Sequence, residues 1–396
     1  MKTLFVNVSS AGHVVPTLDL VGRLVARGVD VAYVEIEAHK TELEAVGARF
    51  LPLPTFPSYD GPTGSQIAKL PVILAHCAIK ATGWILDIID RERPDVLVHD
   101  SLCLWGRLAA DLARVPRVAS IASAAISSCM LTKDPLALAW RSREGDVAPF
   151  RVHYRKSWDE ITRSYGCAPE DEITAVLNVA RRNIVHLSRS LQPEADQFGP
   201  DYIFCGSGEP ARYVAQNFDW ERIRDRRVVF VSFGTAHDPG HAFYQAVAEA
   251  MTGIDAVLVV VESGSMSMTS SIAWPVGTIV CRNGQAPQIA LLQRASLFIS
   301  HVGGGAVREA AWMAAPILGF PQTMEQDLLC RNLVERGAAL RLPDTPDMAT
   351  IRRCIETMLR EPVFRASANA LAALQREGPS RNDAVLTIEE EALQCA

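Results

Sequence analysis

The chain has 396 residues, of which 48% are hydrophobic and 21% are charged. This length indicates two domains of about 200 residues, each large enough to bury a core of its own. The formal net charge of −6 and the pI near 5.9, with no cluster of lysine and arginine, argue against a nucleic-acid partner.

The cysteines and the N-terminal residues indicate the cellular compartment in which we expect the protein. The nine cysteines are scattered singly without a CxxC pair, which is typical of reduced thiols in a cytoplasmic protein. Residues 1–10 are too short an apolar run for a signal peptide and predict a first β-strand instead. The longest apolar runs fall far short of a membrane span, so we expect none.

The first half of the chain alternates between strand-like and helix-like patterns. Continuous β-branched runs separated by amphipathic segments predict a buried parallel sheet with helices on both faces. The expected strands cover residues 3–10, 29–35, 48–54, 94–100, 116–122, 183–190 and 201–207.

Two stretches in this half, residues 56–87 and 129–158, are less regular and contain Pro, Gly and aromatic residues. Insertions of this kind often form the wall of a substrate site, although structural loops are also common. Their aromatic residues could line an apolar ligand pocket or could equally be core. These aromatic residues are Phe56, Tyr59, Trp84 and Trp140.

The second half repeats the α/β pattern after a charged segment that contains Gly and Pro. We therefore expect a Rossmann-like domain over residues 1–205, a linker over 206–227 and a second Rossmann-like domain over 228–396. In such sheets ligands bind beyond the carboxyl ends of the strands.

Residues 12–16, GHVVP, place His13 directly after the first strand, and Pro16 lies near the first turn of a following helix, where proline is tolerated. A histidine there could act as a general base, because it titrates near neutral pH, or it could simply begin a helix. Asp100 ends an expected strand and should reach the same edge of the sheet, where it could orient His13 or cap a helix.

Residues 299–326 read as strand, glycine turn, helix, strand and loop. This order places His301 and several backbone N–H groups at a helix N-terminus, which stabilises an anion. Glu309 lies about two turns further on and can point back to the same ligand. The segment predicts a site for a nucleotide diphosphate.

Other chemistries are poorly supported. No G-x-G-x-x-G motif follows the first strand, as a Rossmann oxidoreductase would require, and no G-x-S-x-G motif of a serine hydrolase occurs. His237 and His241 are spaced like metal ligands, but Pro239 and Gly240 between them predict a loop. We expect no metal site and no cofactor.

These motifs together resemble the GT-B glycosyltransferases of family 1, which include bacterial macrolide and antibiotic glycosyltransferases and the UDP-glycosyltransferases. The matches include a Gly-His-x-x-Pro motif at His13, a Ser-x-Gly-Thr turn at Ser232, and the His-x-Gly…Glu-Ala and Pro-Gln…Glu-Gln pattern that starts at His301. Two positions depart from the family: Ala306 replaces a serine, and Gln285 replaces the tryptophan that stacks on the nucleobase.

The resemblance implies a GT-B fold, with two Rossmann-like domains facing each other across a cleft and a last helix that packs back on the N-terminal domain. It implies that His13 is the general base and Asp100 its orienting partner. It also implies that His301 and the glycine turn hold the diphosphate, that Glu309 binds ribose, and that Glu325 with Gln326 binds sugar hydroxyls. The implied donor-binding residues are Ser232, Gly234, Thr235, Ala286, Gln288, His301, Gly303, Gly304, Gly305, Ala306, Glu309, Glu325 and Gln326.

The predicted function is an inverting, metal-independent glycosyltransferase of the hexosyltransferase type. Its donor would be a UDP- or dTDP-sugar, used as a co-substrate. Its acceptor would be a small hydrophobic molecule, of the aromatic or polyketide-like kind found in natural-product and antibiotic biosynthesis. The alternative is a non-catalytic homologue that binds a nucleotide or a partner protein, which the two departures favour and the intact His13 and Asp100 oppose. The sequence leaves open whether the protein forms a homodimer.

Overall fold

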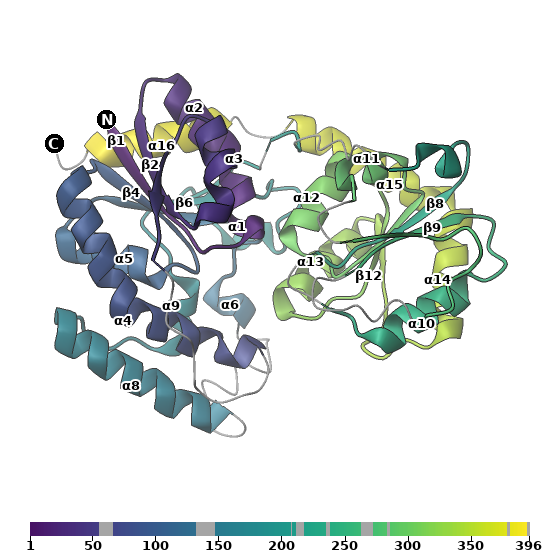
Figure 1. Cartoon of the computed structure of the whole chain (residues 1–396), viewed down its shortest axis with the longest axis horizontal. Coiled ribbons are helices and arrows are strands. Elements are labelled where there is room, and N and C mark those ends of the chain that lie inside the picture. Colours follow the sequence, from purple (N-terminus) through teal and green to yellow (C-terminus); the bar gives the residue numbers. More distant parts are fainter. Residues whose placement is uncertain are drawn as a thin grey trace. The chain divides into compact units, whose positions relative to one another are not determined.

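The structure is a computed structural model that describes residues 1–54, 66–131, 147–206, 208–210, 218–234, 238–262, 272–282, 286–377 and 381–393. It divides into two compact units (Figure 1). Unit 1 comprises residues 1–188, 194–208 and 379–396, and unit 2 comprises residues 189–193 and 209–378.

Unit 1 contains a parallel sheet of seven strands in the order β3-β2-β1-β4-β5-β6-β7. All seven expected strands are present, and the chain order reverses between β1 and β4. The strands are β1 (Lys2–Val6), β2 (Asp30–Glu35), β3 (Arg49–Pro52), β4 (Val96–Asp100), β5 (Arg117–Ile121), β6 (Asn183–Val185) and β7 (Tyr202–Phe204).

Helices cover both faces of this sheet, because successive apolar residues of each strand point to opposite sides. In β1, Leu4 and Val6 pack with α4, α5 and α8, whereas Phe5 packs with α2, α3 and α16 (Figure 1). The helices of unit 1 are α1 (Ala11–Val14), η1 (Val15–Thr17), α2 (Leu18–Ala26), η2 (Glu37–His39), α3 (Lys40–Ala45), α4 (Gln66–Glu92), α5 (Leu104–Ala113), α6 (Ser128–Leu131), α8 (Ala148–Tyr165), α9 (Glu172–Leu177), η4 (Ala195–Gln197) and α16 (Arg381–Leu393).

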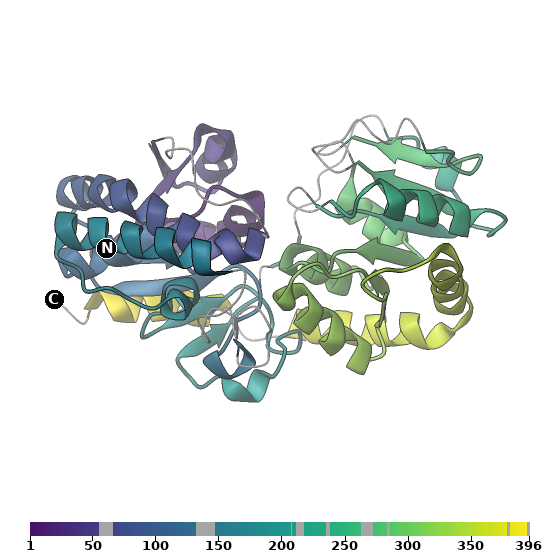
Figure 2. The same ribbon diagram turned by 90° about the horizontal axis from the view of Figure 1, so that it is seen from below.

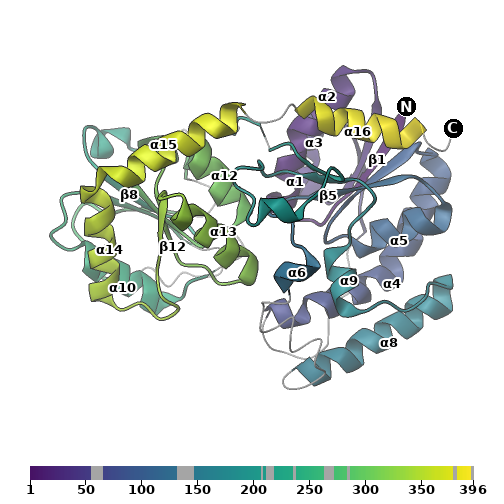
Figure 3. The ribbon, with the colours of Figure 1, turned by 180° about the vertical axis from the view of Figure 1, so that it is seen from behind.

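The final helix, α16, follows unit 2 in sequence but belongs to unit 1, where it lies beside α2 (Figure 3). Its residues Ala384, Val385 and Ile388 are buried in the same core cluster as Phe5. Arg27 of the segment after α2 donates two hydrogen bonds to the Glu389 carboxylate, each 2.8 Å long.

The expectation of irregular structure over residues 56–87 and 129–158 is wrong for two long helices, α4 and α8, which pack against each other (Figure 2). Pro71 and Gly83 interrupt the helical pattern of α4, yet its apolar residues at helical spacing, including Ala78 and Ile85, are buried.

Within the described residues, one segment, Lys69–Glu92 of α4, is long and apolar enough to cross a membrane by length and composition. The uninterrupted apolar runs of the sequence, from which we expected no membrane span, did not indicate this segment. Half of the most apolar 18-residue stretch of this segment is buried. Ala75, Ala81 and Ile88 belong to the core of unit 1, as in the core helix of a globular domain.

Unit 2 contains a parallel sheet of six strands in the order β10-β9-β8-β11-β12-β13, with a reversal between β8 and β11. The short β13 follows the helical segment α13 closely. The strands are β8 (Val228–Val231), β9 (Val257–Val261), β10 (Ile279–Cys281), β11 (Leu297–Ser300), β12 (Ile317–Gly319) and β13 (Ala339–Arg341).

The core of unit 2 lies between this sheet and helices α10 and α14, while α12 packs against α11 and α15 (Figures 1 and 3). The helices are η5 (Trp220–Ile223), α10 (His241–Met251), α11 (Gln288–Arg294), α12 (Gly304–Trp312), α13 (Met324–Glu335), α14 (Met348–Arg360) and α15 (Pro362–Glu377).

Candidate active site

His13 and Asp100 lie at the point in unit 1 where the strand order reverses. β1 pairs with β4, His13 lies in the short α1 that follows β1, and Asp100 is the last residue of β4. The loops after two such strands diverge to opposite faces of the sheet, which makes this edge the usual ligand site of an open α/β sheet.

The structure brings the two side chains into contact. His13 Nδ1 lies 2.7 Å from Asp100 Oδ2, the Asp100 side chain is fully buried, and the His13 side chain is 24% exposed. The backbone N–H of Leu102 donates to Asp100 Oδ1 at 2.7 Å, so both carboxylate oxygens are engaged. With Nδ1–H facing the carboxylate, Nε2 is the basic nitrogen of the neutral ring.

The capping alternative for Asp100 does not describe helix α5, whose N-cap position is held by Cys103 without a side-chain hydrogen bond. The reading of His13 as a helix residue with local contacts only does not fit either, because its partner Asp100 is 87 positions away. His99, the neighbour of Asp100, is fully buried, and its Nδ1 lies 3.1 Å from the main-chain oxygen of Asp100.

A buried polar network that the sequence patterns did not reveal holds the backbone around His13. Asn7 Nδ2 donates to the His13 carbonyl at 3.0 Å and to the Tyr33 hydroxyl at 2.7 Å. Thr17 Oγ1 lies 3.0 Å from that hydroxyl and donates to the Val14 carbonyl at 2.7 Å. Asn7, Thr17 and Tyr33 are almost completely buried. The one available signal was a polar residue, Asn7, directly after the first strand.

In unit 2 the expected donor residues also gather at a reversal of strand order. β8 pairs with β11, Ser232 and Gly234 follow β8, and His301 follows β11. The imidazole of His301 lies against the backbone of Gly234, since a β-carbon there would be 3.4 Å from His301 Cε1. Gly234 has a φ of +66°, which favours glycine as well.

The turn after His301 is strained. Val302 is fully buried and has a φ of +64°, a conformation that β-branched residues rarely adopt. Its N–H donates to Ser300 Oγ at 3.2 Å. Strain of this kind costs about 1–3 kcal/mol and tends to occur at functional turns.

Helix α12 starts directly after this turn, with Gly303 at its N-cap. The N–H groups of Gly304, Gly305 and Ala306 precede the first intrahelical hydrogen bond, which runs from Val307 N to Gly303 O at 2.9 Å. Together with the helix dipole they form an arrangement that suits a phosphate.

Three further expected residues form a chain of side-chain contacts. Ser232 Oγ donates to Gln288 Oε1 at 3.3 Å, and Gln288 Nε2 donates to the Glu309 carboxylate. Burial raises the pKa of Glu309, while the Gln288 hydrogen bond opposes this shift. Ala286 lies just before α11, and its carbonyl accepts from Gln288 N at 2.9 Å.

Glu325 and Gln326 lie in the first turn of α13, after β12. Gln326 is buried, and its side-chain oxygen accepts from Gln322 N at 2.8 Å, while its own N–H donates to the N-cap Thr323. Gln326 therefore helps to fix the loop that precedes the helix, a role that the sequence analysis did not assign.

Four of the expected residues, Phe56, Tyr59, Trp140 and Thr235, lie outside the described residues, as does Gln285. Trp84 is half-buried in α4, where it packs against the core of unit 1. No group of three or more His, Cys, Asp or Glu side chains suited to a metal ion occurs in the part of the chain that the structure describes.

Comparison with known proteins adds to this geometry. A family model described as "Erythromycin biosynthesis protein CIII-like, C-terminal domain" matches residues 245–390. The uncharacterized UDP-glucosyltransferase YdhE of Bacillus subtilis is 27% identical over 98% of both chains. The oleandomycin glycosyltransferase of Streptomyces antibioticus is 28% identical over 95% of this chain and 91% of its own length.

Among solved structures, the glycotransferase of kitacinnamycin superposes with a TM-score of 0.84 at 24% sequence identity, over 99% of each chain. This agreement extends through both units, and it confirms the predicted α/β fold class with two Rossmann-like sheets.

Proposed function

We propose that this chain, a member of the family 1 GT-B glycosyltransferases related to macrolide and other natural-product glycosyltransferases, transfers a sugar from a nucleoside diphosphate donor. The sugar goes to a hydroxyl group of a small natural-product acceptor. The transfer inverts the configuration of the anomeric carbon and needs no metal ion. The protein is a glycosyltransferase enzyme. The contact between His13 and Asp100 is the observation that carries the mechanism.

His13 acts as the general base in this proposal. Nε2 takes the proton of the acceptor hydroxyl as its oxygen attacks the anomeric carbon, and the bond from that carbon to the diphosphate oxygen breaks. Asp100, held 2.7 Å from Nδ1, keeps the ring in the Nδ1–H tautomer and balances the charge of the imidazolium that forms. A single displacement of this kind inverts the anomeric configuration.

The donor is bound by the loops that follow β8, β11 and β12. His301 and the first N–H groups of α12 stabilise the charge that the leaving diphosphate acquires, which is electrostatic stabilisation by groups already in place. Glu309 accepts hydrogen bonds from ribose hydroxyls once Gln288 yields its place, and Glu325 with Gln326 contacts the sugar.

The donor would be a UDP- or dTDP-sugar, of which the name of the UDP-glucosyltransferase relative supports the first. The acceptor would be small and hydrophobic, as the oleandomycin glycosyltransferase suggests. Ala306 lacks the hydroxyl found at that position in the family, which removes about 0.5–1.5 kcal/mol of net binding. Gln285 in addition replaces the tryptophan that stacks on the nucleobase in the family. We therefore expect a weaker donor site that discriminates little between UDP- and dTDP-sugars.

A donor-by-acceptor screen tests the proposal. Purified protein is incubated with UDP-glucose or dTDP-glucose and a panel of hydroxylated aromatic and macrolide acceptors, and mass spectrometry detects the mass of an added hexose. NMR coupling constants of the product then give the anomeric configuration. Transfer by the wild type, a loss of about 10²–10⁴-fold in His13→Ala with unchanged nucleotide binding, and inversion are expected. Retention of configuration, or an active His13→Ala variant, would overturn the mechanism.

A further inference from the structure

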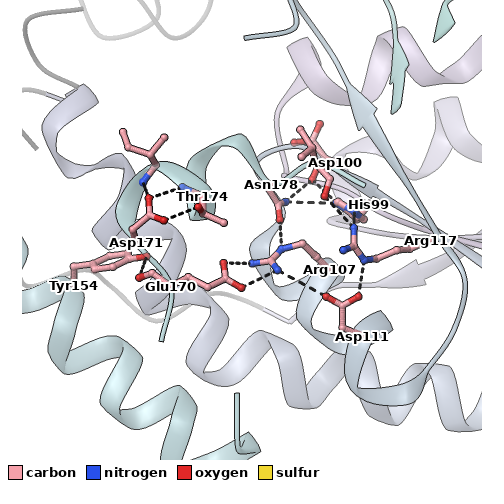
Figure 4. Close-up of polar contacts among 12 residues, drawn as sticks. His99, Asp100, Arg107, Asp111, Arg117, Tyr154, Glu170, Asp171, Thr174 and Asn178 are labelled. Atoms are coloured by element: carbon pink, nitrogen blue, oxygen red, sulfur yellow. Dashed lines mark hydrogen bonds and ion pairs between the residues drawn. The ribbon is translucent and has the colours of Figure 1, made fainter. Parts of the chain in front are cut away.

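A second polar network contacts the main chain of Asp100, and the proposed mechanism does not use it (Figure 4). Its centre is Asn178, at the end of α9, whose side chain is almost completely buried. Asn178 Nδ2 donates to the main-chain carbonyl of Asp100 at 3.2 Å. The amide therefore holds the residue that carries the dyad carboxylate.

Asn178 is itself held by a charged pair. Its Oδ1 accepts from Arg107 Nε at 2.6 Å, and the two terminal nitrogens of Arg107 contact both oxygens of Glu170 at 2.9 and 2.6 Å. Arg107 is buried in α5, and a bidentate pair of this kind fixes the plane of the guanidinium. The Asn178 amide is thus locked in orientation at both of its polar atoms.

The backbone conformation of Asn178 also bears on the role of its side chain. Its φ of 44° and ψ of 41° lie in the left-handed region, which Asn tolerates better than most residues. A residue chosen only to end a helix in this conformation needs no buried side chain, and glycine is usual there. The side-chain amide of Asn178 is buried and bonded to Arg107 and to the Asp100 carbonyl, which indicates a role beyond ending α9.

His99 provides a parallel contact to the same carbonyl. Burial, reinforced by the charges of Arg117 and Arg107, lowers the pKa of His99 to about 3, so the ring is neutral. Arg117 Nη1 donates to His99 Nε2 at 3.3 Å, which leaves Nδ1 to donate to the Asp100 carbonyl at 3.1 Å. The main-chain carbonyl of Asp100 is thereby contacted by two further side chains, those of Asn178 and His99 (Figure 4).

We propose that Asn178 is a positioning residue for the His13–Asp100 pair, and that Arg107 and Glu170 hold it in place. By fixing the carbonyl of Asp100, Asn178 sets where the last residue of β4 directs its carboxylate. This matters because a misplacement of about 1 Å at a catalytic group can cost about 100-fold in rate. The assignment of His13 as the base rests on the proposed function, but the contact geometry does not.

Other titratable groups also surround Asp100. Burial, together with the charge of Asp100, raises the pKa of Glu35 and Tyr33 on β2 and of Cys103 before α5. A shift of the Asp100 carboxylate changes the field at these groups too, so the readout must be specific to His13.

NMR titration of the His13 imidazole in histidine-labelled protein provides that readout without requiring turnover. Asp100→Asn removes the negative partner and should lower the titration midpoint of His13 by about 1–3 pH units. Asn178→Gly keeps the left-handed conformation but removes both amide contacts, and it should lower the midpoint by part of that amount. Glu170→Gln, at the outer end of the network, should produce a smaller shift in the same direction.

Glu172→Gln is the matched control. It weakens the 3.1 Å ion pair between Arg151 and Glu172, which joins α8 to the same helix α9 without contacting Asp100. The His13 midpoint should stay at the wild-type value in this variant. An unchanged midpoint in folded Asn178→Gly overturns the proposal; if that variant does not fold, an unchanged midpoint in Glu170→Gln does so.

Steady-state kinetics add an independent check. If the positioning role is correct, Asn178→Gly lowers kcat while the KM for the donor stays the same, because the donor is bound by unit 2. Absence of transfer by the wild type would overturn the proposed function only, since the titration does not depend on it.

Discussion

A β-carbon on Gly303 would lie 2.5 Å from Nε2 of His301 and 3.1 Å from its Cδ2. Real β-carbons essentially never approach another heavy atom so closely, so the imidazole occupies space that only glycine leaves open. Gly303 has a φ of −71°, so its backbone conformation does not require glycine. The close approach of the ring is the physical reason for this residue.

Gly303→Ala should therefore displace His301 and weaken nucleotide binding. Loss of one hydrogen bond to a charged group costs about 1.5–3 kcal/mol, or roughly 10–150-fold in Kd. Calorimetric titration of the wild type and the variant with UDP and dTDP measures this change in Kd. Gly22→Ala in α2 of unit 1 is the control, because the nearest atom to its added carbon, Cβ of Val46, is 3.7 Å away and the residue lies outside the proposed donor site. Equal affinities in the two variants would contradict the steric argument.

Tyr33→Phe should lower kcat by removing the hydroxyl that links Asn7 to Thr17 beneath His13. It leaves buried polar atoms without a partner, at a cost of about 1–3 kcal/mol in the free energy of unfolding. Tyr165→Phe is a matched control: its hydroxyl donates to Ile79 O at 2.6 Å, also in unit 1. Both variants should lose stability, but only Tyr33→Phe should lose turnover, and a parallel loss in both would indicate a purely structural role.

The low pKa of His99 makes the stability of unit 1 sensitive to acid. The folded protein keeps His99 neutral down to about pH 3, whereas the unfolded chain takes up a proton at an ordinary value near 6.5. The stabilising contribution is therefore fully present above pH 6.5 and is lost as the pH falls from about 6.5 to 3, by about 1.4 kcal/mol per pH unit.

Urea unfolding of the wild type and His99→Gln between pH 4 and pH 7.5 tests this. The difference in unfolding free energy between the two should shrink as the pH falls, because glutamine takes up no proton. A difference that is independent of pH would show that His99 is not the group responsible.

Chelation should leave transfer unaffected. In the proposed mechanism His301 and the N–H groups of α12 stabilise the departing diphosphate, a task that Mg²⁺ performs in metal-dependent enzymes. Initial rates with excess EDTA and with added Mg²⁺ or Mn²⁺ provide the measurement. A strict requirement for an added divalent cation would remove His301 from this role.

Much of this architecture could be predicted from the sequence, because buried parallel strands give continuous β-branched runs. The positions of His13 and Asp100 could also be predicted, since residues that follow parallel strands meet at one edge of the sheet. The length of α4 could not be predicted from local pattern, because Pro71 and Gly83 obscure its periodicity and tertiary packing outweighs their intrinsic cost.

The supporting side chains could not be predicted for a different reason. Asn7 and Tyr33 meet only because β1 and β2 pair in the register that places Phe5 opposite Tyr33. Asn178 reaches Asp100 across 78 positions of sequence, through a short helix and a left-handed residue that no periodic pattern reveals.

The return of α16 to unit 1 has a consequence for synthesis on the ribosome. Unit 2 needs only residues up to 378, whereas unit 1 needs the last helix to cover the face that contains Phe5 and Val98. During translation unit 1 must therefore wait, with an apolar surface exposed, until almost the whole chain has emerged. Such a state is prone to aggregation, so a nonsense codon shortly before Arg381 should yield insoluble protein although every residue of the proposed site has been made.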